Sequence, residues 1–281
     1  SVVGTNNAAL GYSAGYDLTT GVENTIVGDS AAANLTTASY CVAIGRQALF
    51  TEDTESSLVA VGRRAMYLNN GGVRNTAVGH GASYNNVNGG SNTAVGYYSL
   101  YNNLGDGNTG CGNDTLYSNT TGEKNTALGN EALENNTTAS HSTAVGHHAL
   151  TTNTTGTQNV AVGSECLQDC STGSNNTAVG TYTMRSLTTG SHNCALGLQA
   201  LYGLSTGVDN VAMGKQALQD VTTGDNNIGF GLDAGRAGSP GGAITTGDNN
   251  IILGNNSHSY LAAKISLSVT SDKRDKTDIK D

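Results

Sequence analysis

The feature that most constrains this chain is an internal repeat of 17 residues. The phrase Asn-Thr-Ala-Val-Gly and its close variants recur, and the glycine returns every 17 residues from Gly11 to Gly96 and again from Gly112 to Gly231. One residue is lost before Gly112, and a last copy ends at Gly254 after a six-residue insertion around RAGSPGGA. We call these fifteen residues the repeat glycines. Units this short cannot bury an apolar side alone, so they must stack around a shared core.

Each position of the repeat has its own residue preference. The residue before the repeat glycine is apolar, the one before that is nearly always Ala, and the residue four before it is usually Asn. After the glycine come two variable residues and then Ala-Leu, as in Ala48-Leu49 and Ala132-Leu133. A polar Thr-Thr-Gly turn follows, as at Thr120-Thr121-Gly122. The unit is therefore expected to hold two short β-like segments and two polar turns.

The alternation of the phrase Thr-Ala-Val-Gly has the period of a β-strand, with Thr and Val on one face and Ala on the other. Recurrent Gly, Asn and β-branched residues disfavour a helical repeat. We predict an all-β chain, a parallel β-solenoid of about fifteen 17-residue coils over residues 1–254. At about 4.8 Å per coil the rod would be roughly 70 Å long.

Two rows of side chains predict how the coils are held. The recurring Asn is expected to stack into a ladder at a turn, each amide bonding the coils above and below. The small Ala suggests that the strand is packed closely on both faces. We therefore predict a homotrimer in which each chain turns its Ala face toward a common axis.

Composition excludes several classes of function. The chain has 39 Gly, one Pro, no Trp and two Phe, so its core must be thin and built from small side chains. A net charge of −9 with no basic cluster argues against nucleic acid as a partner. No run of 18 apolar residues predicts a membrane span, and the first residues show no signal peptide.

The residues that could carry chemistry do not form a recognisable site. The five cysteines are odd in number and scattered, which favours free thiols. His147 and His148 are adjacent and should point to opposite faces of a strand, and Cys166 and Cys170 lack a second pair, so we predict no metal site. No cofactor and no enzymatic activity on an external substrate are expected.

One aromatic stripe stands out. Five residues after the repeat glycine, five consecutive coils carry a ring: Phe50, Tyr67, Tyr84, Tyr101 and Tyr117. The preceding Leu should face inward, so the rings are expected to face outward and stack on one another. Exposed aromatic rings can hold sugars, which makes this stripe a candidate glycan contact.

The repeat resembles two known kinds of protein over about residues 7–254. The phrase before the glycine resembles the β-roll of the YadA-like heads of trimeric autotransporter adhesins, where the coil is shorter. The longer pattern of Asn-Thr-Ala-Val-Gly, Ala-Leu and Thr-Thr-Gly is more similar to bacteriophage tail-fibre shafts. Both resemblances imply a trimeric, elongated attachment protein.

The charged end of the chain, SDKRDKTDI, resembles the start of the self-cleaving intramolecular chaperone domain of phage tail fibres and endosialidase tailspikes. The match lies at Ser271, Asp272, Arg274, Lys276 and Ile279. The resemblance implies cleavage between Ser271 and Asp272, with Ser271 as the nucleophile and Lys276 activating it. Residues 271–281 would be the start of a truncated chaperone that cannot cleave, and residues 255–270 a connecting strand segment.

The expected function is structural and adhesive: a trimeric rigid shaft of a phage tail fibre, assembled in the host cytoplasm and serving host-cell attachment. Its partners would be its own copies, other tail-fibre or baseplate proteins and a glycan or protein receptor on the host surface. The alternative is the head of a bacterial trimeric adhesin at the cell surface, which a signal peptide and a C-terminal membrane anchor in the full gene would identify. A monomeric ice- or mineral-binding solenoid ranks last, because the Thr pairs lie in turns and are interrupted.

Overall fold

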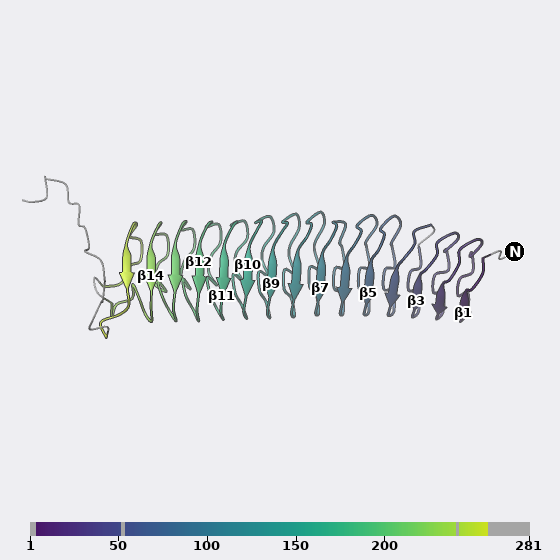
Figure 1. Ribbon diagram of the computed structural model, residues 1–281, viewed down its shortest axis with the longest axis horizontal. Coiled ribbons are helices and arrows are strands. Elements are labelled where there is room, and N and C mark those ends of the chain that lie inside the picture. The colour runs from purple at the N-terminus through teal and green to yellow at the C-terminus, as the bar shows by residue number, and fades with distance from the viewer. Residues whose placement is uncertain (1–3, 52–53, 240–241, 258–281) are drawn as a thin grey trace, which may run out of the picture.

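The computed structural model describes residues 4–51, 54–239 and 242–257, and within them the chain is an all-β parallel solenoid (Figure 1). Fifteen strands of three residues form one parallel sheet in chain order. They are β1 Ala8–Leu10, β2 Thr25–Val27, β3 Val42–Ile44, β4 Val59–Val61, β5 Thr76–Val78, β6 Thr93–Val95, β7 Thr109–Cys111, β8 Thr126–Leu128, β9 Thr143–Val145, β10 Val160–Val162, β11 Thr177–Val179, β12 Cys194–Leu196, β13 Val211–Met213, β14 Ile228–Phe230 and β15 Ile251–Leu253. The predicted fold class is confirmed.

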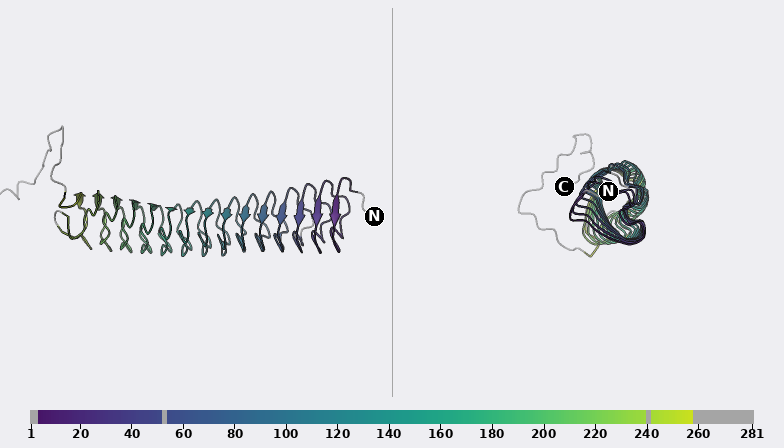
Figure 2. Two further views of the ribbon diagram at one scale, coloured as in Figure 1. Left: turned by 90° about the horizontal axis from the view of Figure 1, so that it is seen from below. Right: turned by 90° about the vertical axis from the view of Figure 1, so that its right-hand side faces the viewer.

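The coils stack in a constant register. Each strand residue pairs with the residue 17 positions later, as Thr76 does with Thr93. The two exceptions are the 16-residue step from Thr93 to Thr109 and the 23-residue step from Ile228 to Ile251. The end-on view shows that the coils stay stacked along one axis, each turned slightly relative to the last, despite these changes (Figure 2). The lost residue and the insertion are therefore absorbed in turns, and the sheet continues through both.

The core lies inside each coil and is built from two rows of side chains. The middle residue of the strand points inward, and Ala43, Ala77 and Ala144 are fully buried there. The Leu four residues after the repeat glycine meets it from the opposite wall, as the buried Leu49 and Leu133 show. This inward Leu was predicted correctly.

The proposed role of the Ala face at a trimer axis is wrong. The strand Ala residues are buried by their own chain, so they cannot line a contact with another chain. Ala is small here because a 17-residue coil leaves little room between its strand and the Leu wall. The face that the strands turn outward carries the Thr and Val positions instead.

The prediction of two β-segments in each coil is also corrected, because only one forms. After the repeat glycine the backbone enters left-handed conformations at alternate residues, with φ of 57° at Gln47 and 52° at Leu49. These angles break an extended strand. The segment nevertheless bonds to the next coil, since the Leu49 amide donates to the carbonyl of Ala65 over 2.9 Å.

The repeat glycine is required by both its conformation and its surroundings. Gly79 has a φ of 137°, and a Cβ built on it would lie 2.1 Å from the carbonyl oxygen of Gly96 in the next coil. Side chains rarely adopt that φ, and no real Cβ approaches a backbone atom so closely. Glycine is therefore the only residue that lets the strand turn at this corner while the coils stay about 4.8 Å apart.

The predicted Asn ladder is present and satisfies buried backbone groups. The Oδ1 of Asn75 accepts from the backbone amide of Asn92 over 2.8 Å. The Nδ2 of Asn92 donates in turn to the carbonyl of Gly105 over 2.9 Å. Each amide thus ties its own coil to the next. Since buried polar groups are costly unless paired, the ladder also fixes the register.

A second Asn ladder, absent from the sequence predictions, lies seven residues after the repeat glycine. The Nδ2 of Asn86 donates to the carbonyl of Gly89 over 2.7 Å and to the Oδ1 of Asn69 over 3.2 Å. The ladder ends at Asn153, and its position is taken by Cys170 and then by the apolar Leu187, Leu204 and Val221. All of these side chains are buried, so polar and apolar rows fill the same site in different coils.

Candidate functional site: two surfaces of the rod

The first surface is the outward face of the sheet, made by the first and third residue of every strand; we call it the sheet face. Its third position is apolar throughout, and most of these side chains are partly exposed: Ile44 is 37% exposed, Leu128 38% and Leu196 50%. The first position alternates mainly between Thr and Val. The fifteen described strands place no charged side chain on this face. Its third-position column is apolar along the whole stack, and the first column adds Thr hydroxyl groups at seven of the fifteen strands.

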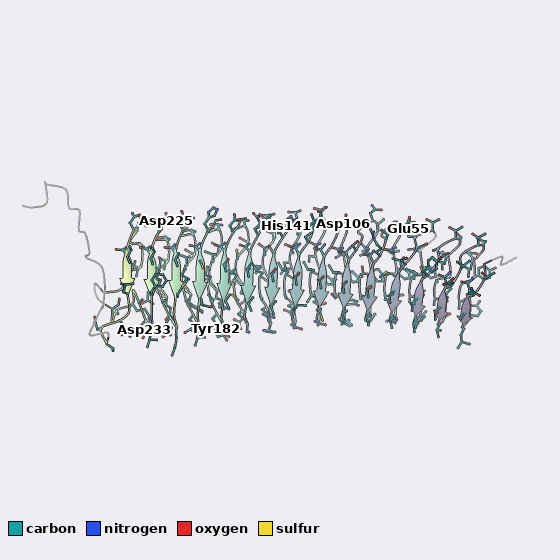
Figure 3. All side chains as sticks on the ribbon, viewed as in Figure 1. Glu55, Asp106, His141, Tyr182, Asp225 and Asp233 are labelled. Atoms are coloured by element: carbon teal, nitrogen blue, oxygen red, sulfur yellow. The ribbon has the colours of Figure 1, made fainter. Side chains whose placement is uncertain are left out.

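The second surface lies where the chain turns after the repeat glycine. It consists of the residues one, two and five positions after that glycine, and we call it the display edge. Tyr182 and Asp233, both two positions after a repeat glycine, lie on this edge, opposite the turns that carry Asp106, His141 and Asp225 (Figure 3). Its residue types change from coil to coil. The variable positions could have been found by aligning the repeats.

The predicted aromatic stripe forms part of the display edge and stacks as expected. Phe50, Tyr67, Tyr84, Tyr101 and Tyr117 follow one another with ring centroids 4.9–5.1 Å apart and planes within 17° of parallel. All five side chains are half-buried. Each inner ring has both faces covered by its neighbours, so the ladder offers ring edges to a ligand along its length.

Further aromatic rings gather near the C-terminal end of this ladder. Tyr97 is 46% exposed and its ring lies 4.0 Å from that of Tyr98. Tyr98 occupies the space above Gly81, where a Cβ would come within 2.5 Å of the ring. The two rings border a cleft of about 260 Å³ that is also lined by Asp114, Tyr117 and Glu134. We call it the tyrosine cleft.

The carboxyl groups of the tyrosine cleft are partly desolvated. Burial raises the pKa of Asp114, and the charge of Glu131 adds to the rise. The pKa of Glu134 is raised for the same reason, with Glu131 and Asp114 adding to it. Both groups therefore hold protons more readily than a free carboxyl, and hydrogen-bond donors in the cleft would find strong acceptors.

Two further clefts on the display edge are built around arginines. Arg185 pairs with Glu165 over 2.8 Å in a cleft of about 320 Å³ lined by Tyr182, Gln199 and Tyr202. Arg236 pairs with Asp233 over 2.9 Å beside the insertion, where a cleft of about 400 Å³ opens. The three clefts thus carry different sets of polar and aromatic groups, and they follow one another from the middle of the rod to its C-terminal end.

The histidine pair is placed differently from the prediction. His147 and His148 lie in the turn after Gly146 and not on a strand, and their rings stack 3.8 Å apart. His148 also contacts Glu131 over 2.7 Å. Among the described residues, no three His, Cys, Asp or Glu side chains gather as metal ligands would.

The remaining predicted site residues divide into two groups. Ser271, Asp272 and Lys276 lie outside the described residues, as do the charged terminus and most of the 255–270 segment. None of the five cysteines forms a disulfide: Cys41, Cys166 and Cys170 are buried, while Cys111 and Cys194 lie on the sheet face. Burial raises the pKa of Cys166 and of Cys170 to about 12, so neither is reactive at neutral pH.

Neither the protein-family models nor the curated proteins compared with this chain match it. Within the described residues, no helix is long and apolar enough to span a membrane.

Proposed function

We propose that this chain is the rigid shaft of a homotrimeric attachment fibre of the bacteriophage tail-fibre type. The observation that carries the proposal is the sheet face, an uncharged surface whose third-position column is apolar in all fifteen strands. Exposed apolar patches of this extent are characteristic of interaction surfaces. A straight stack of coils supplies stiffness and length, which is what a spacer between a virion and a host surface needs.

The mass in solution tests this proposal. Light scattering behind size exclusion should give three copies of the 28.5 kDa chain. The head of a bacterial trimeric adhesin would give the same mass, and sequencing the full gene for an anchor barrel and a signal peptide distinguishes it. A one-chain mass at every concentration would contradict both readings, since each requires a trimer.

Glycan contact is a second candidate function, favoured by the tyrosine cleft. Tyr97 offers an exposed aromatic ring for contact with a sugar, and Asp114 and Glu134 offer acceptors for the sugar's hydroxyl groups. A glycan array should show binding that is lost in Tyr97→Ala and Asp114→Asn. Tyr12→Ala is the matched control, because Tyr12 holds the same repeat position in the first coil and is 81% exposed. Equal loss in the control would rule out the cleft as the contact.

Self-cleavage belongs to the same proposal and concerns a longer precursor. We infer that a chain extended by the complete chaperone domain is cut between Ser271 and Asp272. Mass spectrometry of the extended chain should find a product ending at Ser271, and Ser271→Ala should remain uncut. Lys276→Ala should slow the cut if that amine accepts the hydroxyl proton.

A further inference from the structure

The composition and spacing of the sheet face indicate which partner binds to it. We propose that it binds further copies of the same chain, side by side, parallel and in register along the rod. This inference rests on the proposed homotrimer and assigns the surface that holds it together. The surface is not the row of Ala residues that the sequence suggested, because that row is buried within each chain.

The chemistry of the face favours burial in an assembly. Its third-position column includes Leu128, Leu196, Met213 and Phe230, which are 38–50% exposed in the single chain. A chain with a net charge of −9 nevertheless keeps charged side chains off both columns of all fifteen strands. Interface cores are depleted of charge in this way, whereas ordinary protein surface is not.

The spacing of the face selects a copy of this chain over an unrelated partner. Coils recur about every 4.8 Å, and the same kinds of side chain recur with them. A partner that fits equally well at every coil must repeat at the same distance. A second copy of this chain meets that condition at every coil.

The area of the face requires contact along the full length of the rod. A strand of three residues is about 10 Å wide, and fifteen coils extend about 70 Å, so the face covers roughly 700 Å². A stable two-chain interface buries about 1,600 Å² in total. A trimer divides each face between two neighbours and buries three faces, roughly 2,100 Å² in all.

The symmetry of the proposed trimer sets the direction. Three identical chains that close around one axis along the rod all point the same way, and each layer brings together the same coil of every chain. The third position is mostly Val in the N-terminal half and becomes Leu196, Met213, Phe230 and Leu253 in the last four strands. The copies therefore meet through small side chains at one end of the rod and through larger ones at the other.

Two native thiols report this arrangement. Cys111 in β7 and Cys194 in β12 are on the sheet face and lie five coils, about 24 Å, apart. Packed sheet faces are about 10 Å apart, which a bismaleimide of similar span can bridge. Parallel copies in register bring each thiol next to its own counterpart. In an antiparallel pair, Cys194 would face the fourth coil and lie about 40 Å from its counterpart.

The experiment treats the whole chain with a bismaleimide at pH 7 and counts covalent dimers on a denaturing gel. Cys111→Ser leaves Cys194 as the reactive thiol on the face, and Cys194→Ser leaves Cys111. Both variants should form dimers, and the chain carrying both substitutions should form none. The buried Cys41, Cys166 and Cys170 serve as internal controls in that double variant.

The outcomes separate this inference from the proposed function. A three-chain mass with dimers in both single variants supports the two together. A three-chain mass without dimers in Cys111→Ser overturns the parallel, in-register sheet face and leaves the trimeric shaft standing. A one-chain mass at every concentration overturns both.

Discussion

The sheet face and the display edge belong to the same repeat but differ in how freely their residues vary. On the sheet face the third position stays apolar through fifteen strands, whereas the position five after the repeat glycine is Phe50, then Tyr67, and later Glu134, Arg185 and Tyr202. A position that has the same kind of side chain in every coil indicates a contact that is the same in every coil. A position that varies is free to meet a local ligand. The comparison therefore separates an assembly surface from a recognition surface.

The largest effect is expected from placing charge on the two surfaces. Leu128→Asp with Leu196→Asp should reduce the mass from three chains to one, because each buried carboxylate would be unpaired at the interface. Leu198→Asp with Leu232→Asp is the matched control, since these display-edge leucines are 41% and 46% exposed. Its mass should remain that of three chains. If both variants dissociate, the two surfaces do not differ in the way we infer.

A smaller effect is expected on the free energy of unfolding, where a buried residue and its neighbour on the display edge can be compared. Leu133 is fully buried and Glu134 follows it on the edge. Leu133→Ala should lower the free energy of unfolding by about 2–5 kcal/mol, because it leaves a cavity in a closely packed core. Glu134→Ala should change it by less than about 0.5 kcal/mol. Thermal and urea denaturation measure the stability of both variants. Similar losses would show that display-edge side chains also stabilise the solenoid.

The aromatic ladder should show an intermediate effect. Tyr84→Ala removes two stacked contacts, with ring distances of 5.0 Å to Tyr67 and 4.9 Å to Tyr101. A loss of about 1–3 kcal/mol in the free energy of unfolding follows from two such pairs. Tyr12→Ala, an exposed ring, should cost little by comparison. A negligible loss in Tyr84→Ala would mean that the ladder is maintained for a ligand and not for stability.

The smallest effect is a pH dependence of the tyrosine cleft. Because burial raises the pKa of Glu134 in the folded chain, its ionised form disfavours folding at neutral pH. Glu134→Gln should therefore raise stability at pH 7, by less than about 1 kcal/mol given solvent screening. The gain should disappear as the pH falls below about 4, where the native carboxyl is protonated. A gain that is equal at both pH values would contradict the assigned cause.

Much of the solenoid could be predicted from the sequence because it depends on contacts between equivalent residues of neighbouring coils. The 17-residue period brings Asn75 beside Asn92 and Tyr67 beside Tyr84, whatever the shape of the coil. The first Asn ladder, the inward Leu and the stacked rings were predicted on that basis. The sheet and its chain order follow from the same repeat.

What the repeat could not determine is which side of the strand faces inward. Alternation at period two separates Ala43 from Val42 and Ile44, but it is the same whichever face is enclosed. Closure of the coil decides this, through the left-handed residues after the repeat glycine and the Leu wall that they bring opposite the strand. That closure buries Ala, exposes the sheet face and gathers Tyr97, Asp114 and Glu134 around one cleft. The sequence by itself determined which residues lie beside one another along the rod, and only the tertiary structure decided which of them reach its surface.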